Sequence, residues 1–171
     1  GTQKEWFKYW KEARMKWHLS LGMGEENYRF HDHEKMAHYA DAATDIEFKF
    51  PFGFKELEGI HSRTDFDLKQ HEEFSGKKLQ YFDHEENASY TPYVLETSIG
   101  LDRMFLAVFS NALVEEELDN NTTRTVLKLP AVLAPVKAAI LPLVKKDGLP
   151  EIAKKIVDDL KWDFNVDYDE K

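Results

Sequence analysis

Aromatic and apolar positions near the start of the chain recur at helical spacing. The recurring positions over residues 3–21 are Trp6, Tyr9, Trp10, Ala13, Trp17 and Leu21. Intervals of three and four predict an amphipathic helix that ends near Gly22 and Gly24. We expect its aromatic face to pack on a sheet, because a nucleobase-stacking surface would interleave basic residues on the same face.

The spacing of apolar residues changes in the next part of the chain. Residues 29–42 mix charged residues with small and aromatic ones, and we predict mostly helix there. From Thr44 to Phe50 polar and apolar residues alternate, which predicts a half-buried strand. The Pro51-Phe52-Gly53 turn then leads into a second strand over residues 54–60. Strands joined by so short a turn are expected to pair in antiparallel fashion.

Further elements follow as far as residue 118. Ser62 or Thr64 can cap a short helix that runs through Gln70 and is followed by Gly76. Residues 78–82 and 90–96 flank a polar loop and predict a hairpin. The segment GLDRMFLAVFSNALVEEEL has an almost wholly apolar centre, which predicts a helix buried under a sheet.

The composition changes again towards the C-terminus. Residues 116–125 are polar and lack periodicity, which predicts a linker. Beyond them, an apolar stretch, an amphipathic helix over residues 149–160 and an alternating stretch over residues 162–168 predict a β-α-β unit. Such a unit is typical of a parallel sheet in a second domain.

Composition and charge exclude several classes of protein. With 171 residues and 42% hydrophobic residues, the chain can bury a core without cross-links. The absence of cysteine excludes disulfide frameworks and thiolate chemistry, and favours an intracellular protein. A net charge of −9 repels nucleic acid and anionic membranes as a whole. We find neither a membrane span nor a signal peptide, and the start at Gly1 suggests a piece of a longer chain.

Histidine and acidic residues raise two alternatives that their pattern disfavours. His33 and His38 are five residues apart, so on a helix they would be separated by about 140° and could not share one metal ion. Glu56 and Glu58 lie two apart on a predicted strand and would face the same side, where paired carboxylates can perform acid–base chemistry. Because the chain has 32 acidic residues, a solvated face is the simpler interpretation. We predict no metal site.

Arginine is more informative because it occurs only five times. Arg63 and Arg103 follow predicted strands within apolar surroundings, where a guanidinium needs a partner and can grip a carboxylate or phosphate. The segment PYVLETSIGLDR ends on Arg103 and runs from a strand through Glu96 and Gly100 into a helix. The glycine admits a ligand close to the backbone, and the helix N-terminus favours anions. With Glu96 present, one crevice could hold an ammonium and a phosphate together.

The segment YVLETSIGLDRMFLAVF closely resembles motif 3 of the class II aminoacyl-tRNA synthetases, with its glycine-x-aspartate-arginine element. Two earlier stretches, RFHDHEKMAHYADAATDIEF and FPFGFKELEGIHSRTDFDLKQH, are similar to the dimeric glycyl-tRNA synthetase family. The later stretch LPAVLAPVKAAILPL resembles the start of that family's anticodon-binding domain. The resemblance covers essentially the whole chain, with its stretches in the right order.

The resemblance implies an α+β fold in two parts. Residues 1–115 would be the C-terminal part of the class II catalytic domain, an antiparallel sheet with flanking helices and with motif 3 at residues 92–113. Residues 116–125 would be a linker, and residues 126–171 the first β-α-β part of an α/β anticodon-binding domain. Motifs 1 and 2 would precede Gly1, so we expect a fragment that is not a competent catalyst by itself.

The resemblance also implies a reaction and the residues that carry it. Glycine and ATP would give glycyl-adenylate and pyrophosphate, with Mg²⁺ on the phosphates, and glycine would then pass to tRNA(Gly). Arg63, near the glycine carboxylate or adenylate, and Arg103, on the γ-phosphate, would be the catalytic arginines. The glycine-binding residues would be Glu96, Thr97, Ser98, Ile99 and Gly100. The ATP-binding residues would be Glu56, Leu57, Gly100, Leu101, Asp102 and Arg103.

The family implies a cytoplasmic homodimer with glycine, ATP and tRNA(Gly) as partners, and with neither DNA nor a membrane. One alternative is a catalytically silent, synthetase-like accessory or tRNA-binding protein. Such a protein would be expected to lose Glu96, Ser98 or Arg103, and all three are present. The other alternative, a histidine–metal hydrolase, is disfavoured by the five-residue spacing of His33 and His38.

Overall fold

The computed structural model describes residues 2–119 and 121–170, which form two compact units, Gly1–Lys128 and Leu129–Lys171. The first unit contains α1 (Gln3–Leu19), a 3-10 turn η1 (Glu25–Asn27), β1 (Tyr28–Asp32), β2 (Ala42–Phe50), β3 (Gly53–Ser62), α2 (Phe66–Ser75), β4 (Tyr81–Asp83), β5 (Ala88–Tyr90), β6 (Leu95–Ile99), α3 (Leu101–Ala112), β7 (Leu113–Glu117) and β8 (Thr123–Leu127). The second unit contains β9 (Ala138–Ile140), α4 (Leu149–Leu160) and β10 (Val166–Tyr168). Among these described helices, none is long and apolar enough to cross a membrane.

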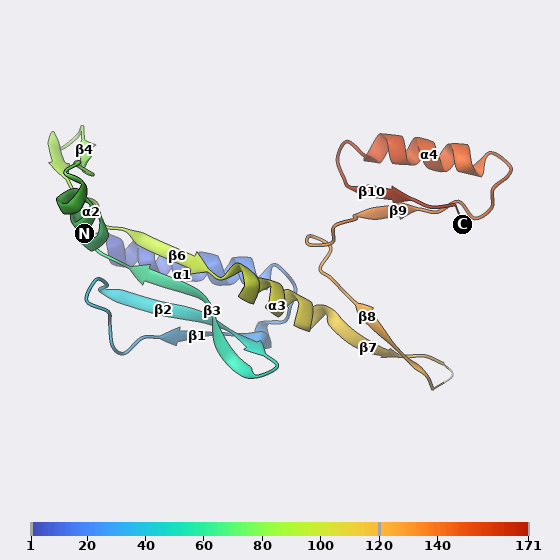
Figure 1. The fold of residues 1–171 in the computed structure, drawn as a ribbon, viewed down its shortest axis with the longest axis horizontal. Helices are drawn as coiled ribbons and strands as arrows, with labels where there is room; N and C mark the ends of the chain where they lie inside the picture. Colours follow the sequence, from blue (N-terminus) through green and yellow to red (C-terminus); the bar gives the residue numbers. More distant parts are fainter. Residues whose placement is uncertain (1, 120, 171) are drawn as a thin grey trace. The chain divides into compact units, whose positions relative to one another are not determined.

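A four-stranded antiparallel sheet with the order β1-β2-β3-β6 organises the first unit (Figure 1). The predicted pairing of β2 with β3 is confirmed, and the turn between them closes where Phe50 pairs with Gly53. Gly53 has φ of 101°, a backbone conformation that favours glycine. Mixed helix and antiparallel sheet is therefore the observed fold class of this unit.

The core of the first unit lies between the sheet and its helices. Its largest fully buried apolar side chains, Ile46, Phe48, Leu57 and Ile60, all come from β2 and β3. Side chains of α1 and α3 pack against this cluster, namely Phe7, Met15, Leu19, Met104 and Val108. The sheet and its two covering helices are held together mainly by this apolar burial.

The predicted orientation of the first helix is wrong, although the helix itself is confirmed. Trp6 and Tyr9 are 53% and 55% exposed, whereas Phe7 and Met15 contact the core and His18 is fully buried. Successive helical residues are about 100° apart, so the face through Phe7, Met15 and His18 lies beside the aromatic stripe. Aromatic content therefore did not identify the buried face.

Two predicted elements of the sheet region are also corrected. Residues 29–42 are mostly not helical, because residues 28–32 pair as strand β1 with β2. β1 is an edge strand with four exposed residues out of five, so it tolerates the charges that suggested a helix. The predicted hairpin of residues 78–82 with 90–96 is confirmed in part, because β4 pairs with β5 and places Tyr81 opposite Tyr90. Residues 95 and 96 belong instead to β6, which joins β3.

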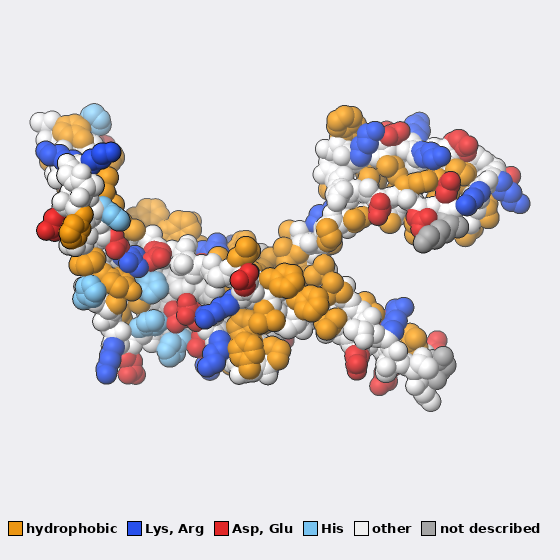
Figure 2. Space-filling view, viewed as in Figure 1, with side chains coloured by type: hydrophobic (Ala, Val, Ile, Leu, Met, Phe, Trp, Pro, Cys, Tyr) orange, Lys and Arg blue, Asp and Glu red, His pale blue; other side chains and the backbone are white. Residues whose placement is uncertain are grey.

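The predicted helices α2 and α3 are both present, but the burial of α3 differs from the prediction. α2 begins after Asp65 and ends at Gly76, which has φ of 66° as expected for a C-terminal cap. α3 is not buried under the sheet on all sides, since Leu101 and Phe105 are 82% and 67% exposed. Figure 2 shows hydrophobic side chains on the surface over α3. One stripe, which includes Ala107, is enough to pack the helix on the core.

The polar segment predicted as a linker forms a hairpin instead. β7 and β8 pair in antiparallel register, with Leu113 opposite Leu127 and Glu116 opposite Arg124. Glu116 accepts hydrogen bonds of 2.9 and 2.8 Å from Arg124, and Val114 lies opposite Val126, so both charged and apolar pairs join the two strands. In the second unit β9 and β10 are parallel and α4 lies between them in the chain, which confirms the predicted β-α-β unit.

A buried charged cluster joins α1 to the sheet. The carboxylate of Glu58 on β3 is 1% exposed and accepts hydrogen bonds from Arg14 Nε at 2.5 Å, Arg14 NH2 at 3.1 Å and His18 Nε2 at 2.7 Å. Burial, the largest influence, would raise the pKa of Glu58. The hydrogen bonds from His18 and Arg14 outweigh burial and hold the pKa below its ordinary value of 4.5.

This depressed pKa predicts how stability depends on pH. A carboxyl group with a lowered folded-state pKa stabilises the fold above its unfolded pKa, and that contribution is lost as pH falls through the folded pKa. Urea unfolding should therefore show Glu58→Gln about 3 kcal/mol less stable than wild type at pH 7. The difference should shrink progressively below pH 4.5, the ordinary value.

Glu47→Gln is the matched control, because Glu47 on β2 pairs with Arg29, whose side chain is 53% exposed. We expect this substitution to cost less than about 1 kcal/mol at pH 7. A Glu58→Gln deficit that stays constant between pH 7 and pH 3 would contradict the ionised, buried state of Glu58.

Candidate functional site

The face of the sheet opposite α1 carries two of the predicted glycine-binding side chains, those of Glu96 and Ser98. In the β3–β6 register, Glu96 lies opposite His61 and Ser98 lies opposite Gly59. Residues directly opposite each other in an antiparallel pair point to the same face, and neighbours along a strand alternate. Because Glu58 contacts α1, Gly59 and His61 face the other way, and so do Ser98 and Glu96.

Arg63 joins this face from the residue after β3. Its backbone N–H donates to Val94 O at 2.9 Å, and Val94 N–H donates to Thr64 O at 2.8 Å, which ties the start of β6 to the end of β3. The guanidinium donates to Glu96 Oε2 at 2.7 Å. It also donates to both carboxylate oxygens of Asp67, at 2.6 and 3.1 Å.

Two carboxylates therefore hold one guanidinium at this site. The hydrogen bond to Asp67 is the largest cause of a raised pKa of Arg63, and the bond from Arg63 lowers the pKa of Asp67. The guanidinium carbon also lies 4.2 Å from the centre of the Tyr39 ring, a cation–π distance. Asp67 and Tyr39 fix Arg63 in position, which leaves the contact with Glu96 free to change partners.

This arrangement can bind a small zwitterion. A free carboxylate would find a guanidinium in Arg63, and an ammonium group would find a carboxylate in Glu96, within one hydrogen-bond length of each other. Side chains of Arg63 and Glu96 are 23% and 35% exposed, so both can be reached and both are partly desolvated. Charge-assisted hydrogen bonds are stronger in such a setting than in water.

Arg103 belongs to a second group of residues at the start of α3. Gly100 precedes the helix, and Arg103 in its first turn donates from NH1 to the backbone oxygen of Glu56 at 2.8 Å. The same nitrogen lies 3.4 Å from Glu56 Oε2. Its side chain is 55% exposed, so Arg103 is available to a ligand rather than enclosed by core partners.

A hollow of about 370 Å³ lies beside Arg103 and Glu56, and its other lining residues are Phe50, Phe52, Lys55 and Leu106. Phe50 and Phe52 are stacked, with ring centres 5.2 Å apart. An aromatic wall beside a guanidinium and a lysine can accept a planar group that carries negative charge. The predicted ATP-binding residues Glu56 and Arg103 are thus brought together, 47 positions apart in sequence.

Other predicted site residues face away from both groups. Thr97 and Ile99 lie opposite Ile60 and Glu58, so by alternation their side chains point to the α1 face of the sheet. Leu57 is 1% exposed and packs in the core, and Leu101 is 82% exposed. Leu57, Thr97 and Ile99 can therefore contact a ligand on the open face chiefly through their backbone atoms.

The predicted pairing of Glu56 with Glu58 on one side of a strand is wrong. The β2–β3 register shifts between Ile46 and Glu47, so Leu57 is an extra residue on β3 and forms a β-bulge. Glu58 is 1% exposed against α1, whereas Glu56 is 53% exposed. Sequence spacing alone could not show the bulge, because the extra residue is defined only by its partner strand.

The histidines of the first unit form local pairs instead of a metal centre. His33 Nε2 lies 2.9 Å from Asp45 Oδ2, and its ring meets the ring of His61 edge-on with centres 6.0 Å apart. His38 contacts Phe66. Over residues 2–119 and 121–170, no three histidine, aspartate or glutamate side chains are grouped to hold a metal ion.

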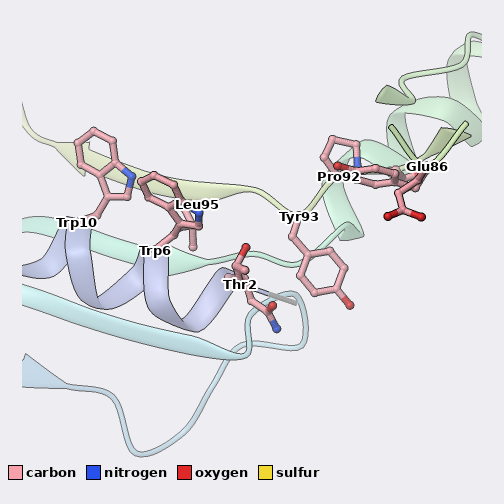
Figure 3. Close-up of a pocket in the computed structure, with 10 residues that line it drawn as sticks. Thr2, Trp6, Trp10, Glu86, Pro92, Tyr93 and Leu95 are labelled. Carbon is pink, nitrogen blue, oxygen red and sulfur yellow. The ribbon is translucent and has the colours of Figure 1, made fainter. Parts of the chain in front are cut away.

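A larger hollow, of about 1040 Å³, lies between α1 and the segment before β6. Figure 3 shows Trp6 and Trp10 projecting from α1 beside Leu95, with Tyr93 further along. Its lining is aromatic and uncharged apart from Glu86. The charged groups around Arg63 and Arg103 form the candidate functional site instead, because they can bind ionic groups of a ligand.

Sequence reasoning missed three residues that organise the site. Asp67 lies four residues after Arg63 at the start of a predicted helix, and this spacing is a usable signal for an ion pair. Arg14 and His18 lie four apart on one face of α1 and bind Glu58. Their helical spacing was visible, but the buried carboxylate between them was not.

The chain was compared with known protein families, curated proteins and solved structures. No protein-family model matches the chain. It is 52% identical over 171 residues to glycine–tRNA ligase of Chlorobaculum tepidum, and 53% identical over 172 residues to that of Geobacillus thermodenitrificans. It is 46% identical over 177 residues to the glycine–tRNA ligase of Treponema denticola. These alignments cover 99% of this chain and 36%, 36% and 39% of the relatives.

Among solved structures, a Giardia lamblia prolyl-tRNA synthetase in complex with prolyl-adenylate resembles the chain with a TM-score of 0.47 and 20% identity. That similarity covers 78% of this chain and 25% of the synthetase. The chain spans just over a third of the length of the curated relatives that it matches. Along 99% of its length, the chain is 46% to 53% identical to proteins named glycine–tRNA ligase.

Proposed function

We propose that the chain is the part of a glycine–tRNA ligase that binds glycine and ATP, and that this ligase attaches glycine to tRNA(Gly). The observation that carries the proposal is identity of 52% and 53% over 99% of the chain with proteins of that name. The cluster of Arg63, Asp67 and Glu96 supports it, because paired opposite charges suit an amino acid without a side chain.

Glycine is a zwitterion, so its site must supply a negative and a positive group close together. Glu96, with Ser98 beside it on the open face, would receive the ammonium, and Arg63 would receive the carboxylate. The amino acid would replace the 2.7 Å contact between Arg63 and Glu96 with two ion pairs, one to each. Asp67 would hold the guanidinium during the exchange. Thr97, Ile99 and Gly100 would line the site through their backbone.

ATP would bind beside glycine, across the start of α3. Arg103 would hold the γ-phosphate, and Glu56 and Leu57 would lie on the adenine side. Gly100, Leu101 and Asp102 would follow the phosphates along the helix start, where backbone N–H groups favour anions. Mg²⁺ bound with ATP would neutralise part of the negative charge on the phosphates.

The proposed reaction has two steps. A carboxylate oxygen of glycine attacks the α-phosphorus of ATP, the bond to the oxygen that bridges to the β-phosphate breaks, and pyrophosphate leaves. A ribose hydroxyl of the terminal adenosine of the tRNA then attacks the glycyl carbonyl carbon, and AMP leaves. Both steps depend on positioning and charge stabilisation more than on a dedicated base. We further propose that the ligase works as a homodimer.

Replacing Glu96 tests the glycine side of the proposal. In a ligase of full length that carries this chain, Glu96→Gln removes the countercharge of a partly desolvated ammonium while nearly keeping its shape. The loss in kcat/KM for glycine should be about 2 to 5 kcal/mol, with little change in KM for ATP. Glycine-dependent exchange of pyrophosphate into ATP measures both constants.

The matched control is Glu86→Gln, which changes another exposed carboxylate of the first unit, in the loop between β4 and β5. It should leave both constants unchanged. If kcat/KM for glycine of the Glu96→Gln variant stayed within a factor of about two of wild type, Glu96 would be ruled out as the ammonium site.

Replacing Arg103 tests the ATP side. Arg103→Lys keeps the charge but loses the planar fork that can hold one phosphate through two parallel hydrogen bonds. We expect KM for ATP to rise by a factor that corresponds to about 1 to 3 kcal/mol of lost binding free energy, the scale of hydrogen bonds to charged groups. Because Arg103 and Glu56 are both more than half exposed, the melting temperature should barely change.

Arg124→Lys is the control for Arg103→Lys, because Arg124 pairs with Glu116 at a similarly exposed position, 61% exposed, on β8. This control should change neither the melting temperature nor the ATP kinetics. If Arg103→Lys lowered the melting temperature and left KM for ATP unaltered, Arg103 would be a structural residue and not a ligand of ATP.

A further inference from the structure

The β-bulge at Leu57 separates two residues with opposite environments. Across it, Glu58 pairs with Ile46 and Glu56 pairs with Glu47, so one residue of β3 has no partner on β2. A bulge turns the following side chains and is common beside active sites. Here it directs Glu58 into the core against α1, while Glu56 stays on the surface beside Arg103.

Charged contacts hold both of the residues that flank Leu57 at the bulge. Behind it, the carboxylate of Glu58 is bound by Arg14 and His18 of α1, with three hydrogen bonds between 2.5 and 3.1 Å. In front of it, the backbone oxygen of Glu56 accepts a hydrogen bond of 2.8 Å from Arg103 of α3. Only one residue, Leu57, lies between the residue with the anchored carboxylate and the residue with the anchored carbonyl.

A buried ion pair of this kind contributes to specificity more than to stability. Well-packed apolar residues in its place are often as stable, because two charges lose their hydration on burial. An apolar residue at position 58 could pack against α1 in more than one register. The Glu58 carboxylate is satisfied only opposite Arg14 and His18, and a slip of one residue would turn it to the other face.

The geometry points to Glu58 as a positioning residue that fixes the bulge at Leu57 and thereby holds Glu56 and Arg103 in the arrangement that binds ATP. This inference rests on the proposed function, which assigns Glu56 and Arg103 to ATP. Glu58 itself lies on the opposite face of the sheet and touches no substrate. Its effect passes through the two peptide units between its own backbone and the carbonyl of Glu56.

The glycine side has its own anchors and should respond differently. Arg63 is held by Asp67 and by the backbone bonds between residues 63–64 and Val94, none of which involves the bulge. Loosening the bulge should therefore weaken the use of ATP more than the use of glycine. A residue that only stabilised the fold would not produce that difference between the two substrates.

The experiment measures KM for ATP and for glycine by pyrophosphate exchange, in a ligase of full length that carries this chain. Glu58→Gln keeps the size of the side chain and removes the charge, and Arg14→Lys keeps the charge but loses one of two hydrogen bonds. We expect KM for ATP to rise about tenfold with Glu58→Gln and about threefold with Arg14→Lys, the scale of weakened charged hydrogen bonds. KM for glycine should stay within about twofold of wild type.

Met15→Ala is the matched control, since Met15 follows Arg14 on α1 and packs against the core. It should lower the melting temperature without changing the ratio of the two KM values. Equal changes in both KM values with Glu58→Gln, or an unchanged KM for ATP, would overturn the inference. If Glu58→Gln does not fold, Arg14→Lys decides by the same criterion.

The failure of the proposed function would look different. A wild-type ligase without glycine-dependent exchange would contradict the function itself, before any variant is compared. Hydrogen exchange on the 171-residue chain adds a readout that needs no substrate. Glu58→Gln should speed exchange of the backbone amides of residues 56–59 more than those of residues 63 and 94, and equal acceleration would count against a role specific to the bulge.

Discussion

A carboxylate buried between α1 and the central sheet constrains the rest of the first unit. Glu58 is 1% exposed, and a charge in that position is tolerated only because Arg14 and His18 bind it. Those contacts set how α1 lies on β3, so they also decide which face of the sheet stays open. The apolar core supplies most of the stability, but apolar contacts alone would not select one register.

The open face follows from that choice by simple alternation. With Glu58 against the helix, Gly59 and His61 point away from it, and their partners Ser98 and Glu96 do the same. Arg63 then reaches Glu96 from the end of β3, while Asp67 holds it from the first turn of α2. Asp67 lies 4 residues and Glu96 lies 33 residues from Arg63 in the sequence, yet the three charged groups form one small site.

The two charged groups of the site differ in how firmly they are held. Arg63 has two carboxylate partners and an aromatic ring, so it remains in position when Glu96 changes partners. Arg103 has one backbone acceptor and a loosely paired carboxylate, both belonging to Glu56. A rigid site for a small amino acid and a more adaptable site for a long, flexible nucleotide would suit the proposed adenylate-forming reaction.

Short-range patterns in the sequence determined α1, the antiparallel pairing of β2 with β3, and the β-α-β order of the second unit, because each depends on neighbours within a few residues. The motif around Glu96, Gly100 and Arg103 likewise identified the family. Only the tertiary structure decided which face of α1 is buried, that residues 28–32 form a strand, and that residues 113–127 form a hairpin. The bulge at Leu57, which separates Glu56 from Glu58, was equally hidden. Each of these depends on a partner segment, and pairing between segments is decided by packing and by the satisfaction of buried charges rather than by the local order of residues.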